Sequence, residues 1–332
     1  MKPKVYVTRK IPDEALAAIA AECEVRLWNE EEASVPRDVL YREISEAEGL
    51  LCMLTEQVDR ELLAVAPKLK IVSNMAVGYN NIDLDAASER GIMVTNTPGV
   101  LTETTADLTF ALLLAAARRI VEAANYIHAG SWKAWSPMQL TGQDVYGATL
   151  GLIGLGRIGE AVVRRARGFD MNTIYYNRTR KPEIEDALGI RYAELETLLQ
   201  QSDFIVVLTP YTPQTRNLID REQFKLMKRT AVLVNTARGG IVNEAALYEA
   251  LTGGRIWAAG SDVFESEPVS LDHPLLSLPN FVALPHIGSA SIRTRTQMSM
   301  LSANNLLRAL RGEEPEHLLN RQSINIDNLN KK

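Results

Sequence analysis

Residues 149–159 read TLGLIGLGRIG, an apolar run that breaks into closely spaced glycines. The run predicts a buried strand, and the residues from Arg157 onward predict a helix. Gly154 suits the tight turn between them, Gly156 lets the backbone approach a pyrophosphate, and Gly159 lets the helix pack closely on the strand. The N-terminus of such a helix offers unpaired N–H groups and a positive dipole end to phosphates. The pattern therefore predicts a dinucleotide-binding turn. Its expected contacts are Gly154, Leu155, Gly156, Arg157, Ile158 and Gly159.

The rest of the chain predicts two α/β domains, because 332 residues exceed one ordinary core. Short apolar strands alternate with helical stretches before residue 100, and again from residue 149, which predicts parallel sheets covered by helices. Between the two series, residues 101–129 predict one long helix, and a polar, aromatic loop spans 130–147. The expected strands lie at 5–7, 49–54, 70–73 and 92–96, then from 149 and at 173–176, 204–208, 231–235, 258–261 and 281–284. Further helices are expected at 13–21, 36–47 and 86–90, and from just after 288 to about 311.

Composition excludes several classes of protein. A net charge of −5 with no long basic run gives no electrostatic reason to expect nucleic acid or an anionic membrane as a partner. The longest apolar segment, 108–117, is too short to span a bilayer, and the first residues lack a signal-peptide pattern. Cys23 and Cys52 are expected to be core thiols, which suits a cytoplasmic location. The four histidines show no metal-ligand spacing, so no metal is expected.

The segment after the second dinucleotide strand concerns the choice of cofactor. NAD-specific domains usually carry Asp or Glu there for the ribose 2′-hydroxyl. This chain has Asn177, Arg178, Thr179 and Arg180 instead. The arginines can neutralise a 2′-phosphate and donate hydrogen bonds to it. A solvated basic loop is the alternative. The pattern favours NADP(H), and NAD(H) remains possible.

Charged side chains follow three successive strands of the second series. Arg238 comes just past the strand at 231–235, carboxylates including Glu267 follow the strand at 258–261, and His286 follows the strand at 281–284. Open α/β sheets bind ligands at the carboxyl ends of their strands. A single histidine after a strand is more often structural, but the three together indicate a reaction centre.

Several segments carry a family resemblance, namely VGYNNID at 77–83, NTPGV at 96–100, the glycine turn, TARG at 236–239, Glu267-Pro268 and PHIGSA at 285–290. With these segments the chain resembles the D-isomer-specific 2-hydroxyacid dehydrogenases, most closely the glyoxylate/hydroxypyruvate reductase branch. The resemblance covers nearly the whole chain, and it is more specific for the family than for the substrate.

The resemblance implies a role for individual residues. Arg238, Glu267 and His286 would be the catalytic set, with Glu267 chosen over Glu265 because it immediately precedes the proline. Substrate contacts would be Leu54, Val77, Gly78 and Arg238, with Trp135 reaching the pocket of a partner subunit. Cofactor contacts besides those of the glycine turn would be Thr105, Asn177, Arg178, Thr179, Arg180, Thr209, Pro210, Thr215, Thr236, Ala237, Arg238, Asp262, His286 and Gly288.

The resemblance also implies the fold and the reaction. A flavodoxin-like substrate domain would comprise 1–97 plus 289–332, and a Rossmann-type dinucleotide-binding domain 98–288, with a cleft between them. The expected reaction is reduction of glyoxylate to glycolate and of hydroxypyruvate to D-glycerate by hydride transfer. His286 would donate the proton, Glu267 would favour its charged form, and Arg238 would hold the substrate carboxylate.

Alternatives remain at the level of the substrate and of the class of protein. A phosphoglycerate dehydrogenase or a reductase for larger apolar 2-oxo acids would share these motifs. Relatives of the fold also act as dinucleotide-sensing corepressors that bind peptides. The expected partners are a small 2-oxo or 2-hydroxy acid and a second copy of the chain. The homodimer interface would be formed by about 100–147.

Overall fold

The computed structural model describes residues 2–324 and divides the chain into two compact units. Of the described residues, the first unit comprises 2–101 with 291–324, and the second comprises Thr102–Ala290. The limits expected from the sequence, at 97/98 and 288/289, lie within a few residues of these. Each unit is an α/β layer structure built on one sheet, and in both sheets all pairs of neighbouring strands are parallel.

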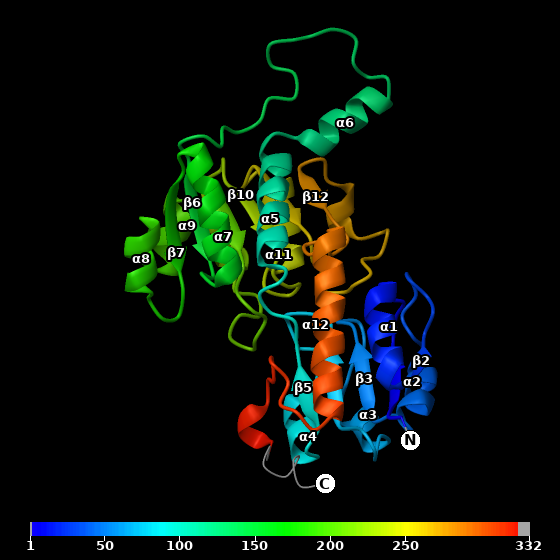
Figure 1. Ribbon diagram of the computed structural model, residues 1–332. Coiled ribbons are helices and arrows are strands. Elements are labelled where there is room, and N and C mark those ends of the chain that lie inside the picture. The colour runs from blue at the N-terminus through cyan, green and yellow to red at the C-terminus, as the bar shows by residue number, and fades with distance from the viewer. Residues whose placement is uncertain (1, 325–332) are drawn as a thin grey trace. The chain divides into compact units, whose positions relative to one another are not determined.

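The first unit contains a five-stranded sheet in the order β2-β1-β3-β4-β5, which is the flavodoxin-like order. Strands β2, β3 and β5 of this sheet are labelled in Figure 1. Its strands are β1 (Lys4–Val7), β2 (Glu24–Leu27), β3 (Gly49–Cys52), β4 (Ile71–Asn74) and β5 (Met93–Thr95). Its helices are α1 (Asp13–Glu22), α2 (Arg37–Ile44), α3 (Arg60–Ala64), α4 (Leu84–Glu89), α12 (Ile292–Leu310) and the 3₁₀ turn η3 (Arg321–Ser323).

The second unit contains a seven-stranded sheet in the order β12-β11-β10-β9-β6-β7-β8, the doubly wound dinucleotide arrangement with one further strand. Its strands are β6 (Thr149–Ile153), β7 (Asn172–Tyr176), β8 (Arg191–Tyr192), β9 (Phe204–Val207), β10 (Val232–Asn235), β11 (Ala258–Ser261) and β12 (Phe281–Ala283). Its helices are α5 (Thr102–Ala117), α6 (Ile120–His128), α7 (Arg157–Ala166), α8 (Pro182–Leu188), α9 (Leu195–Gln201), α10 (Arg221–Leu226) and α11 (Glu244–Thr252), with 3₁₀ turns η1 (Arg167–Phe169) and η2 (Pro274–Ser277).

Burial explains why the central strands read as uninterrupted apolar runs. In β9, Phe204 and Val206 pack with α5 and α7 on one face, whereas Ile205 and Val207 pack with α9, α10 and α11 on the other. A strand covered on both faces needs apolar side chains at every position. This two-sided cover holds the carboxyl ends of β6, β9, β10, β11 and β12 in one rigid edge.

The structure adds elements that the sequence analysis missed, and each has weak local signals. Strand β2 (Glu24–Leu27) lies at the sheet edge and alternates charged, exposed residues with half-buried ones. Strand β8 has only two residues, and α3 only five. Elements this short show no periodicity, so tertiary contacts define them.

The single long helix expected over 101–129 is wrong, because the structure breaks it into α5 and α6. Arg119 takes a left-handed conformation with φ 53°. The carbonyl of Ala117 accepts a hydrogen bond from Gln143 N at 2.9 Å, from the loop that returns past the helix end. A Cβ at Gly142 would overlap that carbonyl, so glycine permits the approach. The interruption turns α6 away from the sheet.

Two smaller expectations concern the thiols and the membrane. Cys23 and Cys52 are buried and form no disulfide, as predicted. Among residues 2–324, no helix has the length and apolar character needed to cross a bilayer.

Candidate active site

The glycine turn joins β6 to α7 where the strand order of the sheet reverses, between β6 and β9. Gly154 has φ 104°, and a Cβ there would lie 2.6 Å from Thr209 N, just beyond β9. A Cβ at Gly159 would lie 2.7 Å from Gly154 O, so the helix packs directly on the turn. A Cβ at Gly156 would meet no atom within 4 Å, and α7 has no side-chain cap. The turn thus leaves open space and an uncapped helix N-terminus at the position where such sheets bind ligands.

Asn177, directly after β7, braces this turn. Its Oδ1 accepts from Leu155 N at 2.8 Å, and its Nδ2 donates to Leu155 O at 3.4 Å. A carboxylate at this position could accept but not donate. In the sequence Asn177 stands where an acid is usual, and the structure adds this bracing contact.

The two arginines that follow have different surroundings. Arg180 donates to both carboxylate oxygens of Glu185, at 2.8 Å each, and is held in a bidentate ion pair. Arg178 and Thr179 are exposed. No described residue forms an ion pair with Arg178. Of the two guanidinium groups, that of Arg178 is therefore the better placed to take up a new anionic partner.

The loop after β9 closes on itself through threonine side chains. Thr215 Oγ1 donates to Pro210 O at 2.8 Å and accepts from Thr212 N at 2.7 Å. The hydroxyl of Thr215 is thus used to shape the loop. Thr209, at the start of this loop, lies against Gly154 in the glycine turn.

Asp262 ties the ends of β11 and β12 together. It is almost fully buried, and its Oδ1 accepts from Ile287 N at 2.8 Å. A Cβ at Gly288 would lie 3.2 Å from Asp262 Oδ2 and 3.4 Å from Thr105 Cγ2, so these three residues form one cluster. Burial raises the pKa of Asp262, against the lowering effect of the two backbone N–H groups that it binds.

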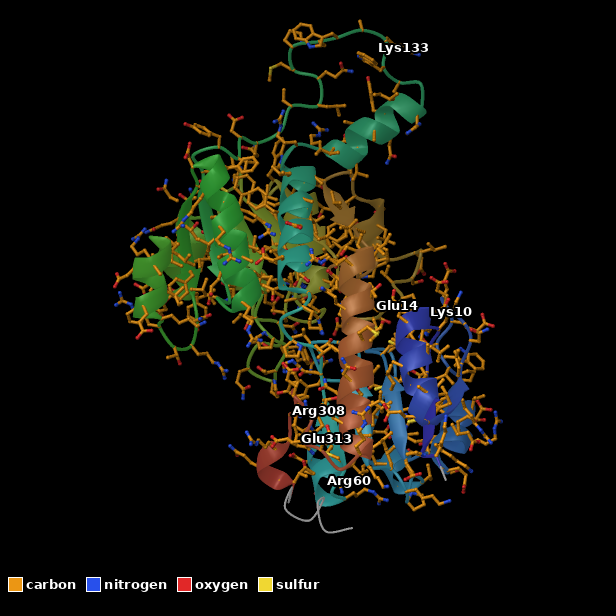
Figure 2. All side chains as sticks on the ribbon, in the orientation of Figure 1. Lys10, Glu14, Arg60, Lys133, Arg308 and Glu313 are labelled. Carbon is orange, nitrogen blue, oxygen red and sulfur yellow. The ribbon has the colours of Figure 1, made fainter. Side chains whose placement is uncertain are left out.

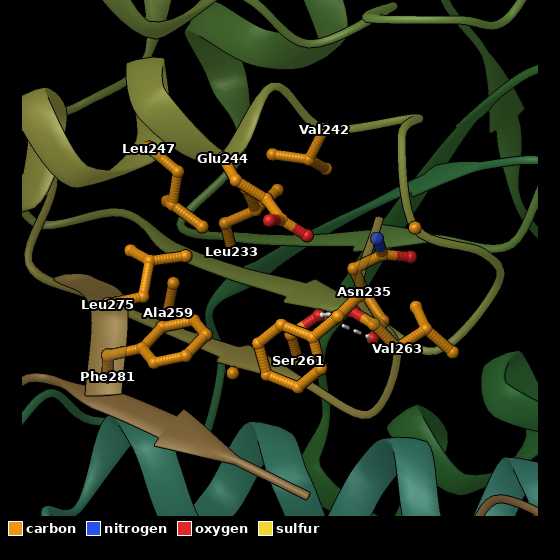
Figure 3. Close-up of a pocket in the computed structure, with 13 residues that line it drawn as sticks. Leu233, Asn235, Val242, Glu244, Leu247, Ala259, Ser261, Val263, Leu275 and Phe281 are labelled. Atoms are coloured by element: carbon orange, nitrogen blue, oxygen red, sulfur yellow. Dashed lines mark hydrogen bonds between the residues drawn. The ribbon is translucent and has the colours of Figure 1, made fainter. Parts of the chain in front are cut away.

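The turn after β10 presents Arg238. Asn235, which lies beside the end of β11 in Figure 3, donates from Nδ2 to Arg238 O at 3.0 Å and accepts from Ala237 N at 3.1 Å. Arg238 Nη1 donates to Ala237 O at 2.7 Å. Thr236 Oγ1 lies 2.7 Å from Thr109 Oγ1 of α5. The strand end therefore fixes the backbone from which the guanidinium projects.

His286 and Glu267 form a direct pair within the second unit. His286 Nδ1 lies 2.7 Å from Glu267 Oε2, and Glu267 Oε1 accepts from Phe264 N at 2.9 Å. Both side chains remain about one-quarter exposed, at 24% for His286 and 28% for Glu267. His286 has φ 56°, a left-handed conformation that few residues other than glycine adopt. A strained backbone at an accessible, paired histidine is typical of a functional position.

The surroundings of the pair favour the ionised form of Glu267 and leave Arg238 positively charged. Burial alone would raise the pKa of Glu267. The hydrogen bond and charge of His286, the Phe264 N–H and the charge of Arg238 together lower it below its ordinary value. Burial lowers the pKa of Arg238, and the Glu267 carboxylate opposes this effect. Arginine keeps its charge in proteins, so an anionic ligand beside Arg238 would meet a fixed positive charge.

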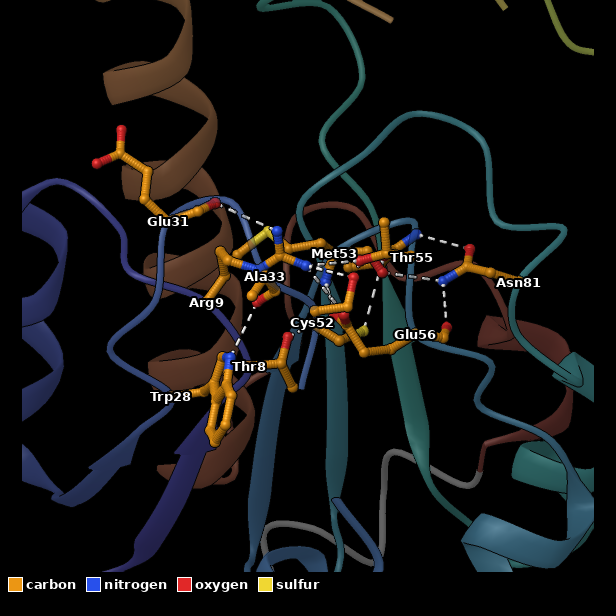
Figure 4. Close-up of polar contacts among 12 residues, drawn as sticks. Thr8, Arg9, Trp28, Glu31, Ala33, Cys52, Met53, Thr55, Glu56 and Asn81 are labelled. Atoms are coloured by element: carbon orange, nitrogen blue, oxygen red, sulfur yellow. Dashed lines mark hydrogen bonds and ion pairs between the residues drawn. The ribbon is translucent and has the colours of Figure 1, made fainter. Parts of the chain in front are cut away.

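The expected substrate residues Leu54, Val77 and Gly78 belong to the first unit. The 53–56 loop that contains Leu54 is held by the buried carboxylate of Glu56 (Figure 4). This carboxylate accepts from Thr8 Oγ1 at 2.5 Å, from Met53 N at 2.7 Å and from Thr55 Oγ1 at 2.6 Å.

The Val77–Gly78 segment is held by the chain that follows β5. Ala76 O accepts from Thr97 N at 2.9 Å, and Val77 O accepts from Asn96 Nδ2 at 2.8 Å. In a trans peptide the N–H points opposite to the carbonyl of the preceding residue. Both carbonyls are fixed, so the N–H groups of Val77 and Gly78 have set directions. The structure gives neither N–H a partner among the described residues.

Helix α6 and the loop after it stand away from the rest of the second unit, with Lys133 near the start of the loop (Figure 2). No residue of α6 is buried, and Ile127, Trp132 and Trp135 are 59%, 56% and 77% exposed. From the sequence we expected Trp132 to pack against its own unit and pin the loop there. This expectation is wrong, because the side chain of Trp132 is largely exposed.

Sequence reasoning missed the residues that hold these loops. Glu56 had no signal in the sequence, because the fold brings Thr8, a distant partner, to its carboxylate. Asn96 stands in the 96–100 segment, but its contact with Val77 O was not predicted. Asn177 was found, but only as a substitution for an acid. A search for polar residues directly after buried strands would have found Asn96, since β5 ends at Thr95.

Comparison with known proteins agrees with this architecture. Residues 110–288 match the model of the D-isomer specific 2-hydroxyacid dehydrogenase, NAD binding domain. The glyoxylate reductase of Korarchaeum cryptofilum is 50% identical over 327 residues, covering 98% of each chain. The chain therefore belongs to the D-isomer specific 2-hydroxyacid dehydrogenase family, as its sequence motifs predict.

Two solved structures extend the likeness to three dimensions. The TT0316 protein from Thermus thermophilus has a TM-score of 0.90 and 45% identity, covering 95% of this chain and 99% of that one. The NADPH-dependent glyoxylate/hydroxypyruvate reductase of Sinorhizobium meliloti, solved with NADP and malonate, has a TM-score of 0.83 and 34% identity over 98% of both chains.

Proposed function

We propose that this enzyme reduces small 2-oxo acids with NADPH, converting glyoxylate to glycolate and hydroxypyruvate to D-glycerate. The observation that carries the proposal is the His286–Glu267 pair at 2.7 Å. The two residues follow β12 and β11, and β11 lies beside β10, the strand that presents Arg238. The name of the Korarchaeum relative and that of the Sinorhizobium enzyme support the choice of substrates.

Each catalytic residue has a role that follows from its chemistry. When bound, a nicotinamide cofactor would supply the hydride chemistry needed at the 2-oxo carbon. His286, with Nδ1 held by Glu267, offers Nε2 as the proton donor to the carbonyl oxygen. Arg238 binds the substrate carboxylate and polarises the carbonyl with its fixed charge. The N–H groups of Val77 and Gly78 are proposed as further donors to that carboxylate, and Leu54 as an apolar wall.

The cofactor site is assigned to the second unit and fits a dinucleotide. The open space at Gly156 and the uncapped start of α7 suit a pyrophosphate. Arg178 is proposed to bind the 2′-phosphate of NADP(H), with Arg180 fixed by Glu185 as a second positive charge. Thr105, Asp262 and Gly288 are proposed to line the nicotinamide end, and 209–215 and 236–237 the remaining length.

A homodimer is proposed from the exposed apolar surface of the second unit. Helix α6 and the loop through Trp135 expose more large apolar side chains than a surface in water normally keeps. A second copy of the chain would cover them, and Trp135 would then contact the partner's substrate. A cytoplasmic location is proposed from the reduced thiols that the sequence predicts.

One steady-state panel tests the proposed function. Glyoxylate, hydroxypyruvate, pyruvate and phenylpyruvate are each measured with NADPH and with NADH. We expect the highest kcat/KM with glyoxylate or hydroxypyruvate and NADPH. Higher kcat/KM with phenylpyruvate would move the substrate class to larger apolar acids, and a preference for NADH would refute the assignment of Arg178.

A further inference from the structure

A second histidine–carboxylate pair lies behind the turn that carries Glu267. Glu244, the first residue of α11, has its Oε2 3.0 Å from His273 Nε2. Its other oxygen, Oε1, accepts from the backbone N–H of Glu265 at 2.6 Å. Figure 3 shows Glu244 among the residues that line a pocket, together with the apolar side chains of Leu247 and Leu275.

These bonds form a continuous chain to the proposed proton donor. The Glu265 N–H binds Glu244, and the adjacent Phe264 N–H binds Glu267 Oε1 at 2.9 Å. The second oxygen of Glu267 binds His286. Two successive backbone N–H groups are thus held by two different carboxylates, and a shift of the 264–265 backbone would displace Glu267 relative to His286.

Packing fixes the turn from two further sides. The ring of His273 meets that of Phe264 edge-on, with centroids 6.0 Å apart. A Cβ at Gly239, next to Arg238, would overlap the backbone of Phe264, so the two turns lie in direct contact there. His273 Nδ1 is buried without a partner among the described residues. The ring therefore makes its polar contact through Nε2 alone, with Glu244.

We propose that Glu244 and His273 are positioning residues for the reaction, holding the 264–267 turn so that Glu267 keeps His286 in register. The inference rests on the proposed function, because it assigns the pair to the support of Glu267. It predicts that weakening the pair lowers turnover without weakening the binding of substrate or cofactor.

Glu244→Ala and His273→Phe test the proposal in the intact enzyme. His273→Phe keeps an aromatic ring against Phe264 and removes only the hydrogen bond. We expect kcat to fall about tenfold in each variant, less than the roughly 10²- to 10⁴-fold contribution of a general acid or base. The KM values for glyoxylate and NADPH should stay within about twofold.

Two variants serve as controls. Glu244→Gln should keep most turnover, because its amide oxygen still accepts from the Glu265 N–H. Glu249 lies on α11, the helix that also carries Glu244, and it forms an ion pair with Arg221 of α10. Glu249→Ala removes this ion pair and leaves the 264–267 turn untouched, so kcat should not change. A similar loss in Glu249→Ala, or unchanged kcat in both Glu244→Ala and His273→Phe, would overturn the proposal.

A double-mutant cycle separates positioning from general stability. In a Glu267→Gln background, Glu244→Ala should cost little further kcat, because the carboxylate that it positions is already gone. If the two losses instead multiply, Glu244 acts by another route and the proposal is wrong. Melting temperatures measured alongside confirm that every variant is folded at the assay temperature.

Nuclear magnetic resonance tests the same contact without turnover. The chain has four histidines, so ¹⁵N ring signals can be assigned by substitution. We expect Glu244→Ala to change the ring nitrogen shifts of His286, and Glu249→Ala to leave them unchanged. Unaltered His286 signals in Glu244→Ala would contradict the proposal. If the protein reduces no 2-oxo acid, the proposed function fails while this measurement still reports on the positioning contact.

Discussion

His286 Nδ1 and Glu267 Oε2 lie 2.7 Å apart, although nineteen positions separate the two residues in the chain. They follow β12 and β11, neighbouring strands of one parallel sheet. The sheet edge brings them together, and the Phe264 N–H holds the other carboxylate oxygen. In the proposed function, the other ring nitrogen of His286, Nε2, donates the proton to the reacting oxygen.

Glu267→Gln should lower kcat by about 10²-fold or more, since the amide cannot stabilise a charged ring as the carboxylate does. The pKa of Glu267 lies below its ordinary 4.5, so the residue stays ionised as the pH falls through that value. The acid limb that belongs to Glu267 in a pH–rate profile should therefore lie below 4.5. His286→Ala tests the proton donor itself, and an unchanged pH–rate profile in that variant would exclude His286 from this role.

Arg238→Lys should lose most turnover, because a point charge cannot reproduce the planar, bidentate guanidinium. The expected fall in kcat/KM for glyoxylate is about 10²-fold or more. Steady-state kinetics at saturating NADPH measures it. Near-normal kcat/KM would show that the substrate carboxylate binds elsewhere.

Arg178→Ala should raise the KM for NADPH about tenfold or more, since charge-assisted hydrogen bonds to the 2′-phosphate are lost. The KM for NADH should hardly change. Arg180→Ala should have a smaller effect on NADPH, because Arg180 is engaged with Glu185. Equal effects of Arg178→Ala on both cofactors would refute the role in phosphate binding.

The ionisation of Glu185 should make the stability of the folded protein depend on pH in the acidic range. The pKa of Glu185 is lowered to about 2. The hydrogen bond from Arg180 is the main cause, the hydrogen bond from Tyr175 adds to it, and burial acts in the opposite direction. A group with a lowered folded pKa stabilises the fold above its unfolded value near 4.5, and this contribution is lost as the pH falls toward 2. Glu185→Gln should therefore lower the melting temperature at pH 7 and narrow its difference from the natural protein below pH 4.5. A constant difference across this range would contradict the ion pair.

If α6 and the loop through Trp135 form the dimer interface, light scattering should give a mass of about twice 36.8 kDa. Ile127→Asp places a charge in the proposed interface and should favour the monomer. Leu271, 96% exposed but outside this segment, provides the matched control. If Ile127→Asp remains a dimer, the interface lies elsewhere. If the natural protein is a fully active monomer, Trp135 has no role in the site.

The sequence predicted the local geometry that depends on residue type and spacing. Gly154 and Gly159 were assigned their turn and packing roles correctly, because each of these close approaches leaves no room for a Cβ. The buried strands were found because sheets covered on both faces require apolar runs. The prediction of a continuous helix through Arg119 was wrong, because the carbonyl of Ala117 accepts a hydrogen bond from Gln143 N in place of a helical N–H.

The sequence by itself thus determined the class of fold, the strand ends that carry Arg238, a carboxylate and His286, and the basic segment at 177–180. The choice of Glu267 among the carboxylates came from the family resemblance. Only the tertiary structure decided which groups meet. It tied Arg180 to Glu185, left Arg178 exposed, and placed Glu244 and His273 behind the turn of Glu267. Such contacts join residues through sheet order and loop packing, which no periodicity along the chain records.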